Sequence, residues 1–322
     1  MKILLTGSSG WLGRFLAPRL REDGHEVLGL DVAAGADTDV IGSVADRPII
    51  DRVFSEFEID AVIHGGALHK PDIARYPKQA FIDVNVTGTL NLLEAASAAG
   101  CDRFVFTSTT SLMISEAIRA GKAGGATKAA WLDESFGPLE PRNIYGVTKR
   151  AAEQLCALHH REHRLPIIVL RTSRFFPEED DTHRGLQGAN IKANEFLNRR
   201  LTVEDAAEAH VAALEKAPEI GFGLYIISAP PPFVRDEAEE LMTDAATVVA
   251  SHYPDAAELY ARAGWQLPQS IERVYDPGLA ERELGFRCQT DFVVVLDALR
   301  NRSPLPFTHD PTYLSPKERL SG

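Results

Sequence analysis

Tyr145 and Lys149 are the two residues whose types and spacing most clearly suggest chemistry. They are four residues apart in a segment whose pattern predicts a helix running to about His163, and residues at this spacing share one face of a helix. An ammonium group so close to a phenol favours the phenolate and lowers the tyrosine pKa from its ordinary value of about 10. Tyr145 could therefore remove a proton from a substrate hydroxyl. The alternative is a solvated helix face, the usual origin of an isolated Tyr-x-x-x-Lys.

A third candidate, Thr109, follows the predicted strand 103–107. Its hydroxyl is expected to hydrogen-bond the reacting oxygen of the substrate, although Ser108 and Thr110 are close enough to compete for this role. We therefore take Thr109, Tyr145 and Lys149 as catalytic candidates and Thr110 as a candidate substrate contact.

Three glycines near the N-terminus predict a phosphate cradle. Gly7, Gly10 and Gly13 follow the apolar strand 2–6 and precede or begin an amphipathic run over 11–21. The first two glycines permit a sharp turn and a close approach to a pyrophosphate, and the third lets the helix pack against the strand. The free N–H groups and positive dipole end of that helix face the negative charge. An ordinary turn is the alternative, but the order strand, turn, helix favours a dinucleotide site.

Asp31 indicates which dinucleotide is bound. It ends a second predicted strand, 26–31, eighteen residues after Gly13, where a carboxylate can accept hydrogen bonds from both hydroxyls of the adenosine ribose. A carboxylate there would repel a 2′-phosphate, so the sequence favours NAD over NADP. The alternative is that Asp31 only caps a turn.

Composition restricts the partners and the compartment. The chain has 322 residues, 44% of them hydrophobic, and 34 basic against 46 acidic residues give a net charge of −12. It can bury a large core, and its field repels nucleic acid and anionic membranes. Cys101, Cys156 and Cys288 are too widely spaced for a disulfide framework or a structural zinc site. With no leader or membrane-spanning apolar stretch in the sequence, we expect a cytoplasmic protein with reduced thiols.

Apolar runs alternate with helical patterns through the first half of the chain. Further strands are predicted at 59–64, 103–107 and 167–171, each after a helical stretch, including a helix over 77–99. This rhythm indicates an α/β fold with a Rossmann-type, doubly wound parallel sheet. We expect the NAD-binding domain to span residues 1–172.

The second half of the chain loses this alternation. Residues 173–322 are expected to form mainly a smaller mixed α/β substrate-binding domain. It is interleaved with the first domain, because a helix at about 203–217 and a strand at about 224–228 are expected to return to the sheet. The glycine-rich segment 114–127 is either a lid over the site or a tolerated surface loop, and the proline-rich tail 303–322 is expected to be an extended strap.

Several motifs occur in the order typical of one known family and cover roughly residues 1 to 300. They are Gly7-x-x-Gly10-x-x-Gly13, Asp31, Asn85-Val86-Thr87-Gly88-Thr89, Phe106-Thr107-Ser108-Thr109, Asp133-Glu134-Ser135 leading into Pro141, Tyr145-x-x-x-Lys149, Val203-Glu204-Asp205-Ala206 and Leu284-Gly285-Phe286. With these, the chain resembles the extended short-chain dehydrogenase/reductase family, in its NAD-dependent epimerase/dehydratase branch. The resemblance is specific for fold and cofactor and much less so for substrate.

The resemblance implies further contacts to NAD. The segment after the third predicted strand would pass along the pyrophosphate, Lys149 would also hold the nicotinamide ribose, and Asn85 would tie the backbone near the site. Ser43 stands where the family usually has an acid beside the adenine. The full candidate set for the cofactor is Gly7, Gly10, Trp11, Leu12, Gly13, Asp31, Ser43, Val44, Gly65, Gly66, Ala67, Lys70, Asn85, Tyr145 and Lys149.

The substrate side departs from the family pattern. Relatives that bind nucleotide sugars have an asparagine where this chain has Arg174, and their Arg-Asp pair before the Val-x-Asp motif appears here as Asn198-Arg199. The stretch from Arg174 to Arg184 is faintly similar to uronate dehydrogenases, in which an arginine holds a sugar carboxylate. Arg174 or Arg184 could therefore bind a phosphate or a carboxylate. The alternative is a surface ion pair with the acidic residues at 178–181.

Two other chemistries are not supported. His159 and His163 have the spacing of metal ligands, but they lie at the end of a solvated helix, so we predict no metal site. Sugar dehydration in relatives needs an acid pair just after the catalytic Thr, and Thr110-Ser111 supplies none.

The sequence therefore predicts an NAD-dependent oxidoreductase that modifies a small carbohydrate-type substrate. The first interpretation is an epimerase of a nucleotide sugar or related carbohydrate that works through a transient keto intermediate. A net dehydrogenase of a free sugar, sugar acid or small hydroxy compound is the alternative, and a catalytically silent NAD sensor is the third. By analogy with the family, a homodimer would form through helices at about 85–99 and 145–163.

Overall fold

A seven-stranded parallel sheet forms the centre of the computed structural model, which describes residues 1–177 and 186–309. The strand order is β3-β2-β1-β4-β5-β7-β8, and every pairing is parallel. This confirms the predicted Rossmann-type fold. The strands are β1 (Lys2–Thr6), β2 (Glu26–Asp31), β3 (Val40–Ile41), β4 (Ala61–His64), β5 (Arg103–Thr109), β7 (Ile167–Thr172) and β8 (Phe222–Ile227).

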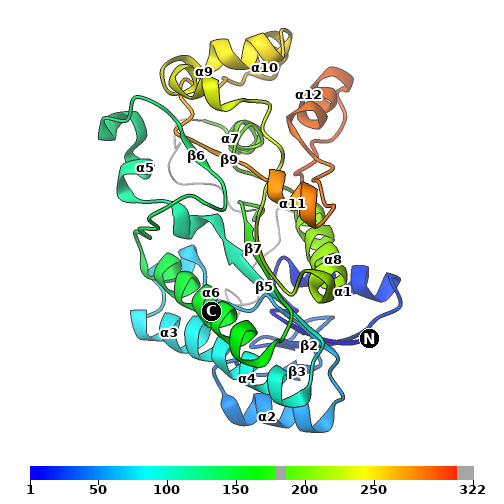
Figure 1. Cartoon of the computed structure of the whole chain (residues 1–322). Coiled ribbons are helices and arrows are strands. Elements are labelled where there is room, and N and C mark those ends of the chain that lie inside the picture. Colours follow the sequence, from blue (N-terminus) through cyan, green and yellow to red (C-terminus); the bar gives the residue numbers. More distant parts are fainter. Residues whose placement is uncertain (178–185, 310–322) are drawn as a thin grey trace.

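Helices cover both faces of the sheet (Figure 1). On one face, α1 (Gly13–Glu22) and α8 (Val203–Ile220) pack on a cluster that includes Ile3 and Val105. The opposite face is covered by α2 (Arg47–Glu56), α4 (Gly88–Ala99) and α6 (Ile144–His163). Strands buried on both sides explain why the apolar runs in the sequence are nearly continuous rather than alternating.

The helix predicted over 77–99 is built from three parts. It begins as α3 (Lys78–Ile82), widens into a π-helical turn, η2 (Asp83–Thr87), and continues as α4 to Gly100, whose positive φ of 73° ends it. Short π-helical insertions are frequent at functional sites. Here the wide turn carries Asn85, which joins two parts of the site described below.

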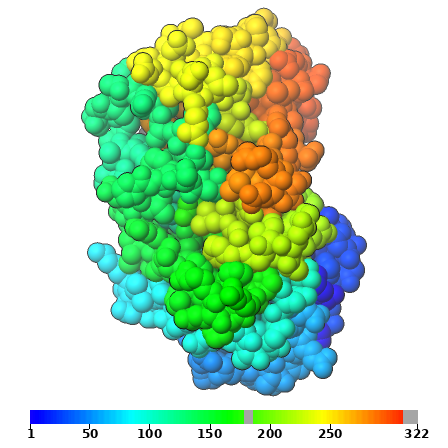
Figure 2. Space-filling model, in the orientation of Figure 1, coloured from blue at the N-terminus to red at the C-terminus, as the bar shows by residue number. Residues whose placement is uncertain are grey.

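The second half of the chain contributes to the sheet and also builds a separate layer. After β7 the chain returns through α8 to β8, which pairs with β7 at the edge of the sheet. The remaining elements have their own core, around Phe196, Leu241 and Phe292. They are α7 (Gly188–Glu195), α9 (Ala238–His252), α10 (Ala256–Ala263), α12 (Phe292–Asn301) and a small parallel sheet of β6 (Ala130–Leu132) and β9 (Arg273–Tyr275). In contrast, α11 (Gly278–Glu283) packs through Ala280 on the cluster that contains Ile3 and Val105. In Figure 2, α9, α10 and α12 form the upper, yellow-to-red end of the molecule.

Two segments connect these layers. The segment at 114–127 contains α5 (Glu116–Ala120) and a 3₁₀ turn, η4 (Gly121–Gly124), and Gly121 packs against Glu272. The chain after α12 stacks Phe307 on Phe196, with ring centroids 5.7 Å apart, and brings His309 to the indole of Trp11. The rest of the predicted strap, from 310 onward, lies outside the described residues. No helix in the described part of the chain has the length and apolar character needed to cross a membrane.

Candidate functional site

The glycine turn between β1 and α1 is packed against the loop after β4. Gly7 has a φ of 78°, and a Cβ atom on it would lie 2.8 Å from the backbone nitrogen of Gly66. A Cβ atom on Gly13 would meet the backbone oxygens of Gly7 and Ser8. Only glycine fits these positions without a shift of the backbone, so the turn has the form that a close pyrophosphate contact requires.

Side chains hold the loop after β4 in place. The Thr6 hydroxyl accepts a hydrogen bond from the Gly66 amide at 3.1 Å and donates to His64 Nδ1 at 2.7 Å, and His64 Nε2 donates to Thr89. Burial and then the Lys149 ammonium lower the pKa of His64 well below its ordinary value. A neutral imidazole is therefore part of the support under the predicted Gly65-Gly66-Ala67 contact.

Asp31 ends β2 beside the glycine turn. Its carboxylate accepts hydrogen bonds from the amides of Ser9, at 3.2 Å, and Ala33, at 3.1 Å. These two bonds fix the carboxylate at the carboxyl edge of the sheet, where a dinucleotide ribose binds in this type of fold. The turn-capping role considered from the sequence and the ribose role are thus compatible.

Three further predicted cofactor contacts are Ser43 and Val44, on the adenine side, and Lys70, in the segment after β4. Val44 is buried, and its carbonyl accepts a hydrogen bond from the Asn91 side chain at 3.0 Å. Ser43 Oγ accepts a bond from the Ala45 amide. Lys70 begins a 3₁₀ turn, η1 (Lys70–Ala74), after the β4 loop. A hydrogen bond from α4 therefore fixes Val44, and short local turns fix Ser43 and Lys70.

The side chain of Trp11 does not form part of the glycine turn itself. Its indole nitrogen donates to the Phe175 carbonyl at 3.2 Å, and its ring packs edge-on against Phe15. Leu12 is buried and is the last residue before α1. The predicted contribution of both residues to cofactor binding is consequently through their backbone N–H groups.

Asn85 has a structural role in the site. Its side-chain oxygen accepts from the Leu68 amide at 2.8 Å, and its amide nitrogen donates to the Leu68 carbonyl and to Thr148. Asn85 therefore fastens the loop after β4 to α6, the helix that carries Tyr145.

Tyr145 is buried at the start of α6, 7% exposed, in a cluster with Leu68 and Phe81. Its pKa is raised to about 12, because burial raises it more than a hydrogen bond with Thr109 lowers it, and Asp72 adds to the rise. The sequence-based expectation of a lowered pKa is wrong for this structure. The spacing in the sequence shows the ammonium four residues away, but it does not show that the phenol is buried and loses its contact with water.

Lys149 is directed at the end of β5. Its Nζ donates to the Thr107 carbonyl at 2.8 Å and lies over the Phe106 ring, 4.6 Å from the centroid. The catalytic candidates Thr109, Tyr145 and Lys149 are thus brought together where β5 meets α6. Thr110, the candidate substrate contact, is buried next to them and donates to the Thr172 carbonyl at 3.3 Å.

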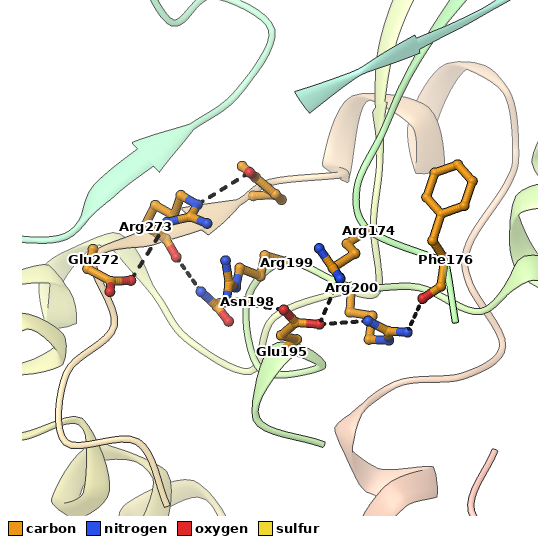
Figure 3. Close-up of polar contacts among 9 residues, drawn as sticks. Arg174, Phe176, Glu195, Asn198, Arg199, Arg200, Glu272 and Arg273 are labelled. Atoms are coloured by element: carbon orange, nitrogen blue, oxygen red, sulfur yellow. Dashed lines mark hydrogen bonds and ion pairs between the residues drawn. The ribbon is translucent and has the colours of Figure 1, made fainter. Parts of the chain in front are cut away.

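A cluster of arginines around one carboxylate lies beyond β7 (Figure 3). Glu195, buried at the end of α7, is 2.6 Å from Arg200, 3.1 Å from Arg199 and 3.8 Å from Arg174. Burial alone would raise the pKa of Glu195, but the three guanidinium groups outweigh it and hold the pKa below its ordinary value. The predicted anion-binding residue Arg174 therefore belongs to a charged group inside the protein. Arg184 and the acidic residues at 178–181 lie outside the described residues.

Two members of this cluster, Glu195 and Arg199, line a cavity of about 270 Å³. Asn198, next to Arg199 in the chain, joins this segment to β9. Its side chain donates to the Arg273 carbonyl at 2.7 Å, and its backbone carbonyl accepts from the Tyr275 amide. The cavity is lined by Leu186, Ile191, Asn194, Glu195, Asn198, Arg199 and residues 266–272.

Sequence reasoning missed Glu195 and Arg200 in this cluster. The sequence signal was only the Asn198-Arg199 departure from the family pattern, and nothing in it indicated a buried carboxylate. Within residues 1–177 and 186–309, no three His, Cys, Asp or Glu side chains form a candidate metal site.

Comparison with known proteins assigns the family. Residues 3–223 match the NAD dependent epimerase/dehydratase family, which is more than half of the chain. The chain belongs to this family. It is therefore an NAD-dependent enzyme of the epimerase/dehydratase type, with the cofactor that Asp31 and the glycine turn predict.

Two similar proteins are UDP-glucose 4-epimerases. The chain is 29% identical to UDP-glucose 4-epimerase 4 of rice (Oryza sativa subsp. japonica) over 268 residues, 69% of each chain. It is 24% identical to UDP-glucose 4-epimerase of Bacillus subtilis, over 85% of this chain and 94% of the other.

Solved structures confirm the fold. A short-chain dehydrogenase/reductase superfamily protein from Agrobacterium tumefaciens, solved with bound NAD, has a TM-score of 0.65 and 23% identity over 94% of this chain and 98% of its own. UDP-glucose 4-epimerase of Thermotoga maritima, solved with UDP-glucose, has a TM-score of 0.64 and 20% identity over 94% and 99%.

Proposed function

We propose that this enzyme is an epimerase of a nucleotide sugar or a related carbohydrate, acting through a transient keto intermediate. One observation carries the proposal: Tyr145, hydrogen-bonded to Thr109, and Lys149 stand at one end of β5 in an enzyme whose glycine turn is built for NAD. The match to the Bacillus subtilis epimerase, over 94% of that protein, supports the substrate class.

NAD would be held by the backbone of the glycine turn and of the loop after β4, with Asp31 at the adenosine ribose and Lys149 at the nicotinamide ribose. When bound, it supplies reversible two-electron oxidation of an alcohol carbon. Tyr145 removes the hydroxyl proton as that carbon becomes a carbonyl, and it returns the proton when the alcohol re-forms. In the free enzyme the Thr109 hydroxyl is hydrogen-bonded to Tyr145. With substrate bound, the same hydroxyl would donate to the reacting oxygen, and the ammonium of Lys149 would stabilise the phenolate.

The arginine cluster would hold the far end of the substrate. Arg174 is 25% exposed in its side chain, whereas Glu195 and Arg200 are each 2% exposed, so Arg174 is the member most available to a ligand. A guanidinium group binds a phosphate or a carboxylate through two parallel hydrogen bonds. Both a nucleotide sugar and a sugar acid would satisfy it, which keeps the net dehydrogenase as the second candidate.

Organisation of the chain follows from this assignment. We infer that residues 1–172, with α8 and β8, bind NAD and that most of 173–322 binds the substrate. All three cysteines are free and buried, in keeping with a reducing, cytoplasmic location.

Exposed apolar residues on α6, Val147 and Leu158, favour a homodimer through α4 and α6. Light scattering that finds only monomer at micromolar concentration would reject the dimer.

The test is a panel of UDP-sugars and free uronic acids, assayed with two readouts. An epimerase inverts a sugar carbon, seen by NMR of the product, without accumulating reduced cofactor. A net dehydrogenase forms one equivalent of NADH for each product molecule, seen by absorbance. Steady NADH formation with a uronic acid, and no inversion of any UDP-sugar, would replace the first proposal with the second.

A further inference from the structure

A buried ion pair lies directly behind the catalytic residues. Glu153, on α6, accepts two hydrogen bonds from Arg171, on β7, at 2.9 and 2.7 Å. Glu153 also accepts a bond of 2.6 Å from the Ser108 hydroxyl. The two side chains are 3% and 6% exposed. Both carboxylate oxygens are thus engaged by the fork of one guanidinium group.

This pair is joined to the catalytic groups through two elements. On α6, Tyr145, Lys149 and Glu153 follow each other at intervals of four residues, so they form one stripe along the helix. In the sheet, Ser108 is in register with Arg171, one residue before Thr109. The stripe on α6 consequently contacts three successive residues of β5: Thr107 through Lys149, Ser108 through Glu153, and Thr109 through Tyr145.

We propose that Glu153 and Arg171 are positioning residues of the catalytic site, with Arg171 neutralising Glu153 so that the Lys149 ammonium stays directed at the end of β5. This inference deepens the proposed function and uses the same site. Without Arg171, the carboxylate one helical turn from Lys149 would be the nearest strong partner for that ammonium. Stability alone is a weak reason for such a pair, because a buried ion pair is often no more stable than an apolar replacement.

The balance of charge around Tyr145 follows from the neighbouring elements. From α6, β4 and α8, the titratable neighbours Cys156, His64 and His210 are all uncharged near neutral pH, because burial raises the pKa of the thiol and lowers the pKa of both imidazoles. From the loop after β4, the titratable ring of His69 contacts the Tyr145 ring, with centroids 5.8 Å apart. The charged groups placed around the stripe include Lys149, Glu153, Arg171 and, from η1, Asp72. Removing one member of the pair therefore changes the local net charge by one unit.

The two single variants should shift the ionisation of Tyr145 in opposite directions. Glu153→Gln leaves the positive charge of Arg171 uncompensated, which favours the phenolate. Arg171→Met leaves the negative charge of Glu153, which disfavours it. At an effective dielectric constant of about 20, a unit charge one or two helical turns away shifts a pKa by about one pH unit. The double variant restores neutrality and should return the wild-type value.

The measurement is the ratio of phenolate to phenol at Tyr145 at one fixed alkaline pH, read by ultraviolet difference against Tyr145→Phe. We expect this ratio to rise roughly tenfold in Glu153→Gln and to fall roughly tenfold in Arg171→Met. Glu162→Gln, at an exposed position of the same helix, is the matched control and should leave it unchanged. Circular dichroism at the same pH checks that each variant is folded.

Equal ratios in all folded variants, or a change of the same sign in both single variants, would overturn the proposal and leave the pair a purely structural one. If Arg171→Met does not fold, Glu153→Gln and the double variant still decide, because only the first should change the ratio. The titration needs no substrate, so it can fail while the proposed function holds, or succeed while that function fails. In an active enzyme, the acid limb of the kcat/KM profile should move in the same directions.

Discussion

The backbone of Gly7 lies so close to that of Gly66 that a Cβ atom on Gly7 would be 2.8 Å from the Gly66 nitrogen. The two residues belong to the loops after β1 and β4, neighbouring strands of the sheet. This contact brings the backbone N–H groups of two loops to one place at the carboxyl edge. The predicted cradle therefore depends on two glycines that are far apart in the sequence.

Gly7→Ala is expected to weaken NAD binding, whereas Gly24→Ala is expected only to destabilise the fold. Both glycines have a similar positive φ, 78° and 80°, but a Cβ atom on Gly24 meets nothing within 4 Å. Each variant should lose about 1 kcal/mol of stability from its φ. Only Gly7→Ala also forces the two loops apart, so its Kd for NAD should rise roughly tenfold or more. Calorimetric titration with NAD checks this, and equal affinities in both variants would contradict it.

Thr109→Ala should move the pH dependence of the reaction to higher pH. The hydrogen bond with Thr109 lowers the pKa of Tyr145, so its loss raises that pKa. Activity that needs the phenolate rises with pH through this pKa, and the acid limb of kcat/KM, which reports the free enzyme, then shifts to the alkaline side. We expect kcat at neutral pH to fall roughly 10²-fold. Thr109→Ser keeps the hydroxyl and should restore both the limb and the rate; if it behaves as the alanine variant does, the hydrogen bond is not the cause.

His210 should make the protein less stable in mild acid. It is buried between Thr107, which donates to Nε2 at 2.8 Å, and the Ala206 carbonyl, which accepts from Nδ1. Burial lowers its pKa to about 4, from 6.5 in the unfolded chain. The unfolded chain therefore takes up a proton first, and stability present above about pH 6.5 is lost as the pH falls towards 4, by roughly 3 kcal/mol.

His210→Gln tests this contribution, because glutamine keeps hydrogen-bonding groups but does not titrate. The urea midpoint of the variant should fall less steeply between pH 6.5 and 4 than that of the wild type. His25→Gln, in the loop before β2, is the control variant. A slope that stays the same in His210→Gln would show that His210 is not the group responsible.

Local patterns in the sequence were enough to predict the sheet and the cofactor turn. Strands that are buried on both faces have nearly continuous apolar sequences. Three glycines at this spacing, directly after such a strand, are typical of a dinucleotide-binding turn. Thr109, Tyr145 and Lys149 could be predicted as one site from local features. Tyr145 and Lys149 are four residues apart on one helix, and Thr109 lies at the end of a strand.

Other parts of the site depend on contacts that no local pattern encodes. The raised pKa of Tyr145 comes from burial beside Leu68, in the loop after β4, and Phe81, in α3. Glu195 is surrounded by arginines from the segments after β7 and α7, and a buried charge of this kind looks in the sequence like any surface glutamate. The π-helical turn at 83–87 has the same apolar pattern as an ordinary helix.

The most direct test of the account is the rate of the NAD-loaded Tyr145→Phe variant with the substrate identified in the panel. The variant lacks only the phenol oxygen, so it should fold and bind NAD, but kcat should fall roughly 10²-fold or more because no group is left to move the hydroxyl proton. A variant that binds NAD and keeps most of the wild-type rate would contradict the central claim that Tyr145 is the acid and base of this enzyme.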